Sequence, residues 1–147
     1  MADKNFTPSW NSRVGLNYTP AYEVSGIPFA RGGINCNQGS AVKIEFPSVT
    51  RWIIIINHGN AAVGTQDVKV AFSEAGLSSK NFFTVPRVTI TPNRGTYPIT
   101  QRIEVKVSEI WLQGSSNVDV IAGLTRILPA SVSTSAGASW KGSTGVG

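Results

Sequence analysis

The stretch Arg51-Trp52-Ile53-Ile54-Ile55-Ile56-Asn57 decides the fold class of this chain. Its four consecutive isoleucines favour a β-strand, because a β-branched side chain fits a pleated surface and is stiff at χ1. Successive side chains of a strand point to opposite faces of the sheet, so a strand with one solvated face would alternate apolar and polar residues. This stretch does not alternate. We therefore expect both faces to be covered, one by the protein's own core and the other by a second layer, a terminal arm or another subunit.

Further strand patterns lie on both sides of this stretch. Apolar alternation or short apolar runs predict strands at 42–46, 68–72, 82–85, 88–90, 103–107, 110–112 and 118–121, with weaker candidates at 14–18 and 22–24. Glycine and proline predict a loop over residues 26–40, and residues 73–80 are expected to form a loop or a single turn. About eight strands without helical patterns predict an all-β fold, specifically a single jelly-roll antiparallel β-sandwich. An immunoglobulin-like sandwich is the main alternative, but Cys36 is the single cysteine, and that fold in antibodies needs two.

The domain organisation follows from length and composition. A chain of 147 residues is expected to form one domain with its own core. We assign residues 1–12 to an N-terminal arm, residues 13–130 to the β-sandwich, and residues 131–147 to a flexible tail, because a segment of serine, glycine and alanine cannot bury enough apolar surface to order itself.

The charge content points to contacts between subunits. Charged residues make up 14% of the chain, whereas an ordinary soluble domain has about 25%. The net charge of +5 comes from thirteen scattered lysines and arginines, no two of them adjacent, so we expect no direct nucleic-acid binding. The N-terminus lacks the apolar core of a signal peptide, and no apolar run approaches the length of a membrane span. The chain is therefore expected not to be secreted.

The residue inventory offers little for catalysis. His58 is the single histidine, and its setting in Asn57-His58-Gly59-Asn60 is typical of a turn. Neither an orienting carboxylate nor a nucleophile is recognisable from the spacing, and no set of cysteine, histidine or clustered acidic residues predicts a metal site. We expect no enzyme activity, no cofactor and no metal. The charged pair Glu104 and Lys106 is expected to be solvated decoration on a strand face.

Aromatic and isoleucine side chains are the candidates for an interface. Trp10 and Trp140 lie in the two terminal segments, where an aromatic residue often anchors a tail onto a neighbour. Trp52 and Trp111 lie inside predicted strands and are expected in a core or an interface. The sequence thus predicts six interface residues: Trp10, Ile53, Ile54, Ile55, Ile56 and Trp140.

Several segments resemble a known family. They are FPSVTRW (46–52), VKVAFSEAG (68–76), NFFT (81–84), IEVKVSEIWL (103–112) and VIAGLT (120–125). Their order and spacing over residues 40–128 resemble the small single-jelly-roll penton (vertex) proteins of nucleocytoplasmic large DNA viruses, alga-infecting ones among them. The resemblance implies a virion protein that is assembled inside the host cell. Five copies would close each fivefold vertex of an icosahedral capsid, beside the major capsid protein and other minor capsid proteins. It implies no catalytic residues.

Two other function classes are weighed against this one. A carbohydrate- or receptor-binding β-sandwich, as in a fibre head or a lectin-like module, would be favoured by tryptophans exposed at loop tips. A hydrolytic or cupin-type jelly-roll enzyme would need several histidines, and this chain has only His58.

Overall fold

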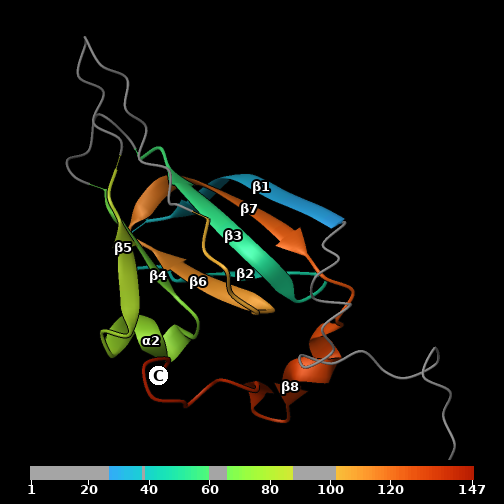
Figure 1. The fold of residues 1–147 in the computed structure, drawn as a ribbon. Coiled ribbons are helices and arrows are strands. Elements are labelled where there is room, and N and C mark those ends of the chain that lie inside the picture. Colours follow the sequence, from blue (N-terminus) through green and yellow to red (C-terminus); the bar gives the residue numbers. More distant parts are fainter. Residues whose placement is uncertain (1–26, 38, 60–65, 88–101) are drawn as a thin grey trace, which may run out of the picture.

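Two antiparallel sheets make up the body of the protein (Figure 1). The computed structural model describes residues 27–37, 39–59, 66–87 and 102–147. The first sheet has the strand order β1 (Ile27–Cys36), β7 (Ser115–Leu124), β3 (Thr50–Asn57). The second has the order β2 (Val42–Glu45), β6 (Glu109–Gln113), β4 (Val68–Ala71), β5 (Phe82–Val85). All of these strand pairs are antiparallel, which confirms the prediction of an all-β antiparallel sandwich.

The core lies between the two sheets. Ile53 and Ile55 of β3 face inward beside Val120 of β7, and all three are fully buried. Residues of the second sheet, among them Ile110 and Leu112, join them in one apolar cluster. Full burial of such a side chain contributes about 1.5–3 kcal/mol, so the alternate isoleucines hold β3 against the opposite sheet.

The chain passes repeatedly from one sheet to the other, as it does in a jelly roll. A jelly roll has about eight strands in two sheets, and the described residues form seven paired strands in the two main sheets. Beside β3, where a fourth strand of the first sheet would lie, there is a single antiparallel bridge between Ile53 and Ile103. The single jelly roll stays a prediction, and this strand order is compatible with it.

The predicted strand at 103–107 is largely replaced by irregular chain. Beyond the Ile103 bridge, the hydroxyl of Thr50 donates to the Val105 carbonyl (2.7 Å) and accepts from the Val107 N–H (3.1 Å). The buried Thr50 side chain thus makes two hydrogen bonds to the backbone of this segment, in place of bonds that a regular strand pair would form between backbones.

β1 occupies residues that the sequence predicted to be a loop. Its pairing with β7 shifts register between Arg31 and Ile34, where Gly32 and Gly33 lie, and Gly33 has a φ of 66°. Glycines at a bulge of this kind interrupt a strand without ending it. Earlier in β1, Phe29 packs edge-on against Phe46, with ring centroids 5.0 Å apart, and fastens the strand to the core.

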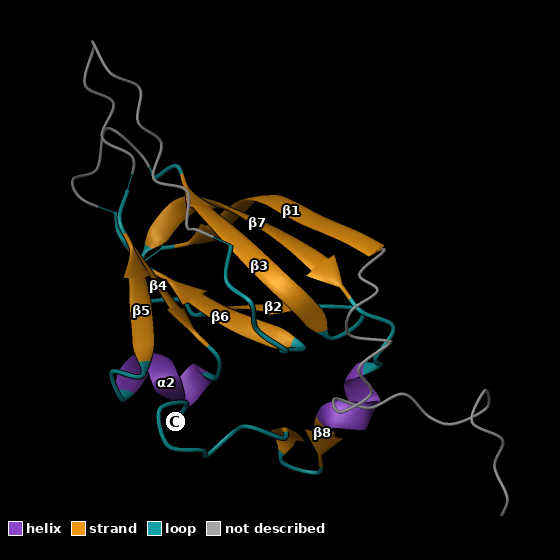
Figure 2. Cartoon of the chain, viewed as in Figure 1, coloured by secondary structure: helices purple, strands orange, loops and turns teal. Residues whose placement is uncertain are grey.

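The C-terminal segment packs on the sandwich, whereas a flexible tail was predicted for residues 131–147. It contains the 3-10 helix η2 (Pro129–Val132) and the small hairpin β8 (Ser133–Thr134)–β9 (Gly137–Ala138), visible at the lower edge of Figure 2. The Trp140 indole N–H donates to the Phe72 carbonyl (3.0 Å), and its half-buried ring contacts the core. Composition alone missed this segment because a few residues anchor it, among them Trp140 and the buried Val132.

A single helical turn, α2 (Glu74–Ser78), follows β4, in agreement with the loop or turn predicted there. Ser73 caps it by accepting a hydrogen bond from the Gly76 N–H (3.0 Å). The Ser73 hydroxyl also donates to the Val146 carbonyl (2.7 Å). The same serine therefore fastens the C-terminal segment to the second sheet.

The predicted segments at 14–18, 22–24 and 88–90, together with Trp10 and the N-terminal arm, lie outside the described residues.

Candidate functional site

The outward face of the β1–β7–β3 sheet is the most distinctive surface among the described residues. Register sets its composition, because residues opposite one another in a sheet point to the same face. Trp52 lies opposite Gly123, Ile54 opposite Ile121, and Ile56 opposite Asp119. β1 adds the exposed Pro28 and Ala30. We call this surface the outer face; apart from Asp119, these residues are apolar or glycine.

The structure separates the four predicted isoleucines into two pairs. Ile53 and Ile55 are fully buried in the core. Ile54 and Ile56 are half-buried on the outer face. The isoleucine run thus has one face in the sandwich core and one on the surface, which sequence alone could not assign.

Trp140, the tryptophan of the C-terminal segment that was predicted at an interface, does not lie on the outer face. Trp140 contacts Phe72 and both apolar clusters of its own chain. Trp52, which was expected in a core or an interface, lies half-buried on the outer face.

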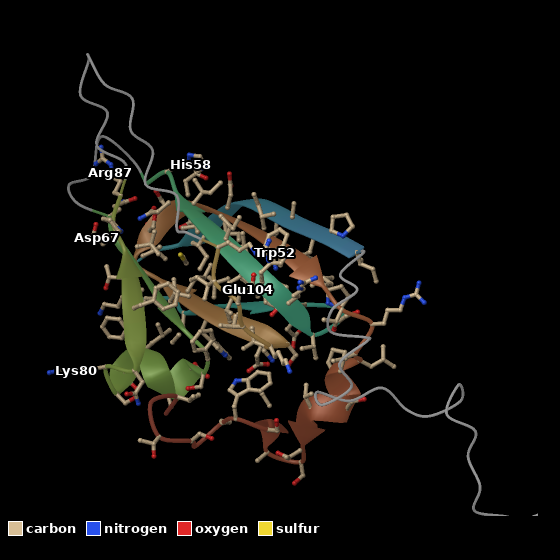
Figure 3. The ribbon with its side chains drawn as sticks, viewed as in Figure 1. Trp52, His58, Asp67, Lys80, Arg87 and Glu104 are labelled. Carbon is tan, nitrogen blue, oxygen red and sulfur yellow. The ribbon has the colours of Figure 1, made fainter. Side chains whose placement is uncertain are left out.

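A groove of about 350 Å³ lies at the Trp52 end of the outer face. Its walls include Ile27, Pro28, Trp52 and two arginines, Arg51 and Arg102. The Arg102 guanidinium lies over the Trp52 ring, 5.6 Å from the centroid, and is ion-paired with Glu104. Figure 3 shows Trp52 and Glu104 on neighbouring segments, with His58 at the opposite end of β3. Glu104 is therefore ion-paired with Arg102, and both side chains stay about half exposed on the surface.

A histidine–aspartate pair, His58 and Asp119, lies at the end of the outer face opposite Trp52. His58 Nε2 lies 2.7 Å from Asp119 Oδ2, and the Gly33 N–H donates to Asp119 Oδ1 (2.8 Å). Burial acts to raise the pKa of Asp119, but the Gly33 hydrogen bond and His58 outweigh it and hold the pKa below its usual value of 3.8. The pair ties β1, β3 and β7 together, and it gives His58 the carboxylate that sequence spacing could not reveal.

A pair of this kind acts in covalent catalysis together with a nucleophile. Cys36 is buried, and burial raises the pKa of its thiol, although a backbone hydrogen bond from Ser115 acts in the opposite direction. Cys36 is therefore a poor nucleophile. Over the described ranges, no group of three or more histidine, cysteine or acidic residues could hold a metal ion.

Asp119 gives a testable pH dependence. Its folded-state pKa is depressed, so the stability it contributes is present above the unfolded pKa and is lost as pH falls through the folded value. We expect Asp119→Asn to cost about 1 kcal/mol or less at neutral pH, because the pair is partly exposed. The cost should begin to shrink near the usual pKa of 3.8 and vanish only when the pH has fallen below the depressed folded-state pKa. Thermal unfolding of both proteins across this pH range measures it; a constant difference at every pH would contradict it.

A second cavity, of about 570 Å³, lies between β2–β6 and the C-terminal segment. Lys43 bridges Glu45 (2.7 Å) and Glu109 (2.8 Å) at its wall. The Glu109 hydrogen bond, and next the Glu45 hydrogen bond, raise the pKa of Lys43. Half-buried Trp111 donates its indole N–H to Glu109 (3.3 Å), so this cluster is internally paired.

Sequence reasoning missed Asn57, a fully buried polar residue at the end of β3. Its amide nitrogen donates to the Gln66 carbonyl (2.8 Å) and the Val85 carbonyl (3.0 Å). Its amide oxygen accepts from the Ser115 hydroxyl (2.7 Å). The signal was available, because Asn57 shares the parity of Ile53 and Ile55 and therefore had to face the core.

No protein-family model, curated protein or solved structure matches this chain. Among the described residues, no helix is long and apolar enough to cross a membrane.

Proposed function

We propose that this chain is a structural capsid protein that forms pentamers at the fivefold vertices of an icosahedral capsid. The observation that supports this most directly is the apolar outer face. Ile54, Ile56, Ile121 and Trp52 occupy positions where a strand with a solvated face would carry polar side chains. Apolar surface of this kind, beyond what the core uses, is typical of a protein–protein interface.

A fivefold ring needs one surface of each subunit to meet a different surface of the next. The charged fraction of 14% leaves uncharged surface for two such contacts and for the neighbouring major and minor capsid proteins. The proposal places the protein in the virion, after assembly in the host cell. It includes no direct contact with nucleic acid and no catalytic role.

The mass of the purified protein in solution tests the proposal. We expect light scattering coupled to size exclusion to give five times the 15.6 kDa of one chain, either alone or when a major capsid protein is co-expressed. The pentamer should persist at high salt, since the contact is apolar. A monomer under both conditions would contradict the proposal.

The second candidate function, a carbohydrate- or receptor-binding module, has one observation in its favour. The groove beside Trp52 joins an aromatic ring to two arginines. Against it, Trp52 and Trp111 lie within strands and Trp140 packs on its own chain, so the described tryptophans are not at loop tips. A monomer that binds glycans would favour this candidate over the capsid protein.

A further inference from the structure

Two large apolar side chains stay exposed at one end of the sandwich. Among the described residues these are Leu128 and Ile27, with exposed fractions of 62% and 43%. Ile27 pairs with Leu124 at the end of β7, and Leu128 follows Leu124 within a single turn of chain. In Figure 1 this is the right-hand end of the first sheet, where β1 begins and β7 ends. Single exposed apolar residues are ordinary, whereas two of them at one end indicate a contact surface, which we call the apolar end.

The backbone holds Leu128 in its outward position. Ile127, next to it, is fully buried; its carbonyl accepts from the Val49 N–H (2.9 Å), and its N–H donates to Thr125 Oγ1 (3.1 Å). Pro129 follows Leu128 and begins η2 with the fixed φ of a proline. Leu128 therefore points away from the core as long as Ile127 stays buried.

A cation lies beside Leu128. Burial alternates along this segment, so Arg126 and Leu128 are exposed while Thr125 and Ile127 are buried. Alternate residues of an extended segment point the same way, which places the guanidinium and the leucine side chain on one side. An arginine keeps its aliphatic stem on apolar surface while its guanidinium reaches polar groups, and it donates well to phosphate oxygens. This combination matches a membrane surface, where phosphate lies directly above hydrocarbon.

We propose that the apolar end docks on a lipid bilayer that contains anionic lipids. Leu128 and Ile27 enter the boundary between headgroups and acyl chains, and Arg126 binds headgroup oxygens. The net charge of +5 favours an anionic surface. A protein partner fits less well, because two projecting side chains cover far less than the about 800 Å² per partner of a stable protein interface. This contact goes beyond the capsid role proposed above and does not depend on the pentamer.

Sedimentation of the full chain with vesicles tests the contact, with mixed phosphatidylcholine–phosphatidylserine vesicles compared with phosphatidylcholine alone. A myristoyl chain binds bilayers with an association constant of about 10⁴ M⁻¹, and two aliphatic side chains bury less hydrocarbon. We therefore expect reversible binding to the mixed vesicles that is half-complete at about millimolar lipid and falls with rising salt. Binding to phosphatidylcholine alone should be about fivefold weaker or less.

Substitutions separate the apolar part of the contact from the charge. Leu128→Ala should weaken binding to the mixed vesicles about tenfold or more. Arg126→Gln should weaken it about fivefold, and on the mixed vesicles only. Lys69→Gln, an equal loss of charge at an exposed residue of β4 in the other sheet, should leave binding unchanged. Because Leu128 and Arg126 are exposed, we expect their variants to keep the circular dichroism of the wild type.

Leu128→Trp reports whether this side chain enters the bilayer. Its added fluorescence should be quenched by lipids with brominated acyl chains, whereas the added fluorescence of Lys69→Trp should not. Equal binding of Leu128→Ala and the wild type, no binding at millimolar lipid, or an unquenched Leu128→Trp would each overturn the contact. So would a change of mass in lipid-free Leu128→Ala, because this end would then join subunits. The mass of the lipid-free wild type decides the pentamer, so the two proposals can fail independently.

Discussion

Asn57→Asp is expected to lower the free energy of unfolding by about 4 kcal/mol, because it places an uncompensated charge in the core. Asn57 is fully buried and joins four segments: its own strand β3, the chain at Gln66, β5 through Val85 and β7 through Ser115. An aspartate has nearly the same shape as asparagine. It lacks the N–H groups, so an ionised carboxylate oxygen would face the Gln66 and Val85 carbonyl oxygens.

For a chain of this length, such a loss lowers the melting temperature by about 8–16 °C. Chemical denaturation followed by circular dichroism measures the change directly. Part of the loss should be recovered in acid, because a protonated aspartate can donate one hydrogen bond. Asn37→Asp is the matched control: Asn37 is exposed, and the hydrogen bond it makes to Asn35 comes from its backbone N–H.

Ser115→Ala provides a milder version of the same test. It removes the donor to the Asn57 amide oxygen and also the acceptor of a long hydrogen bond from the Asn117 N–H (3.5 Å), so we expect a cost of about 1–2 kcal/mol. The effects of Asn57→Asp and Ser115→Ala should not add, since the two side chains share one network. If Asn57→Asp were as stable as Asn37→Asp, the buried network would have no role in stability.

Alternation of residue type predicted the regular strands of the sandwich. β2, β4 and β5 coincide with apolar alternation or short apolar runs, and β3 with the isoleucine run, whereas the predicted strand at 118–121 covers only the middle of β7. The sequence of each of these segments reveals the strand directly, because alternate side chains point into the core. The sheet order does not follow from any local rule, since β7 pairs with both β1 and β3 from distant parts of the chain.

The failures have a common physical cause, namely contacts between residues far apart in sequence. β1 is a strand despite its glycines because β7 pairs with it across the register shift. Residues 104–107 lose their regular ladder because Thr50 bonds their backbone instead. The C-terminal segment is placed by Trp140 on Phe72.

The candidate site was predictable only in part. Both faces of Ile53–Ile56 were expected to be covered. The structure buries Ile53 and Ile55 in the core, and the cover over the half-buried Ile54 and Ile56 stays a prediction. Parity separates the two pairs once one residue is known to face inward. The His58–Asp119 pair could not be predicted, because its partners are 61 residues apart. The groove at Trp52 depends on Arg102, whose neighbour Ile103 is bridged to Ile53 of β3.

Ile54→Asp is expected to abolish self-association while the subunit stays folded. Ile54 is half-buried on the outer face, opposite Ile121, so a charge there can remain solvated in the isolated chain. In an assembled interface the same charge would be desolvated without a partner. A loss of at least 100-fold in the association constant corresponds to about 2.7 kcal/mol, which is typical of a central interface residue. Ile56 is a less suitable position, because an aspartate there would lie opposite Asp119 and be repelled by it.

Two further variants make the comparison decisive. Ile55→Asp, one residue away in a fully buried position, should unfold the subunit itself. Thr84→Asp places the same charge at an exposed position of β5 in the other sheet, opposite Lys69, and should leave both folding and mass unchanged. Light scattering gives the mass, and circular dichroism reports folding in each sample. If Ile54→Asp retains the mass of the wild-type assembly, the outer face is not the subunit contact. If it unfolds as Ile55→Asp does, this face is covered by the chain itself, and the interface must be sought on another surface.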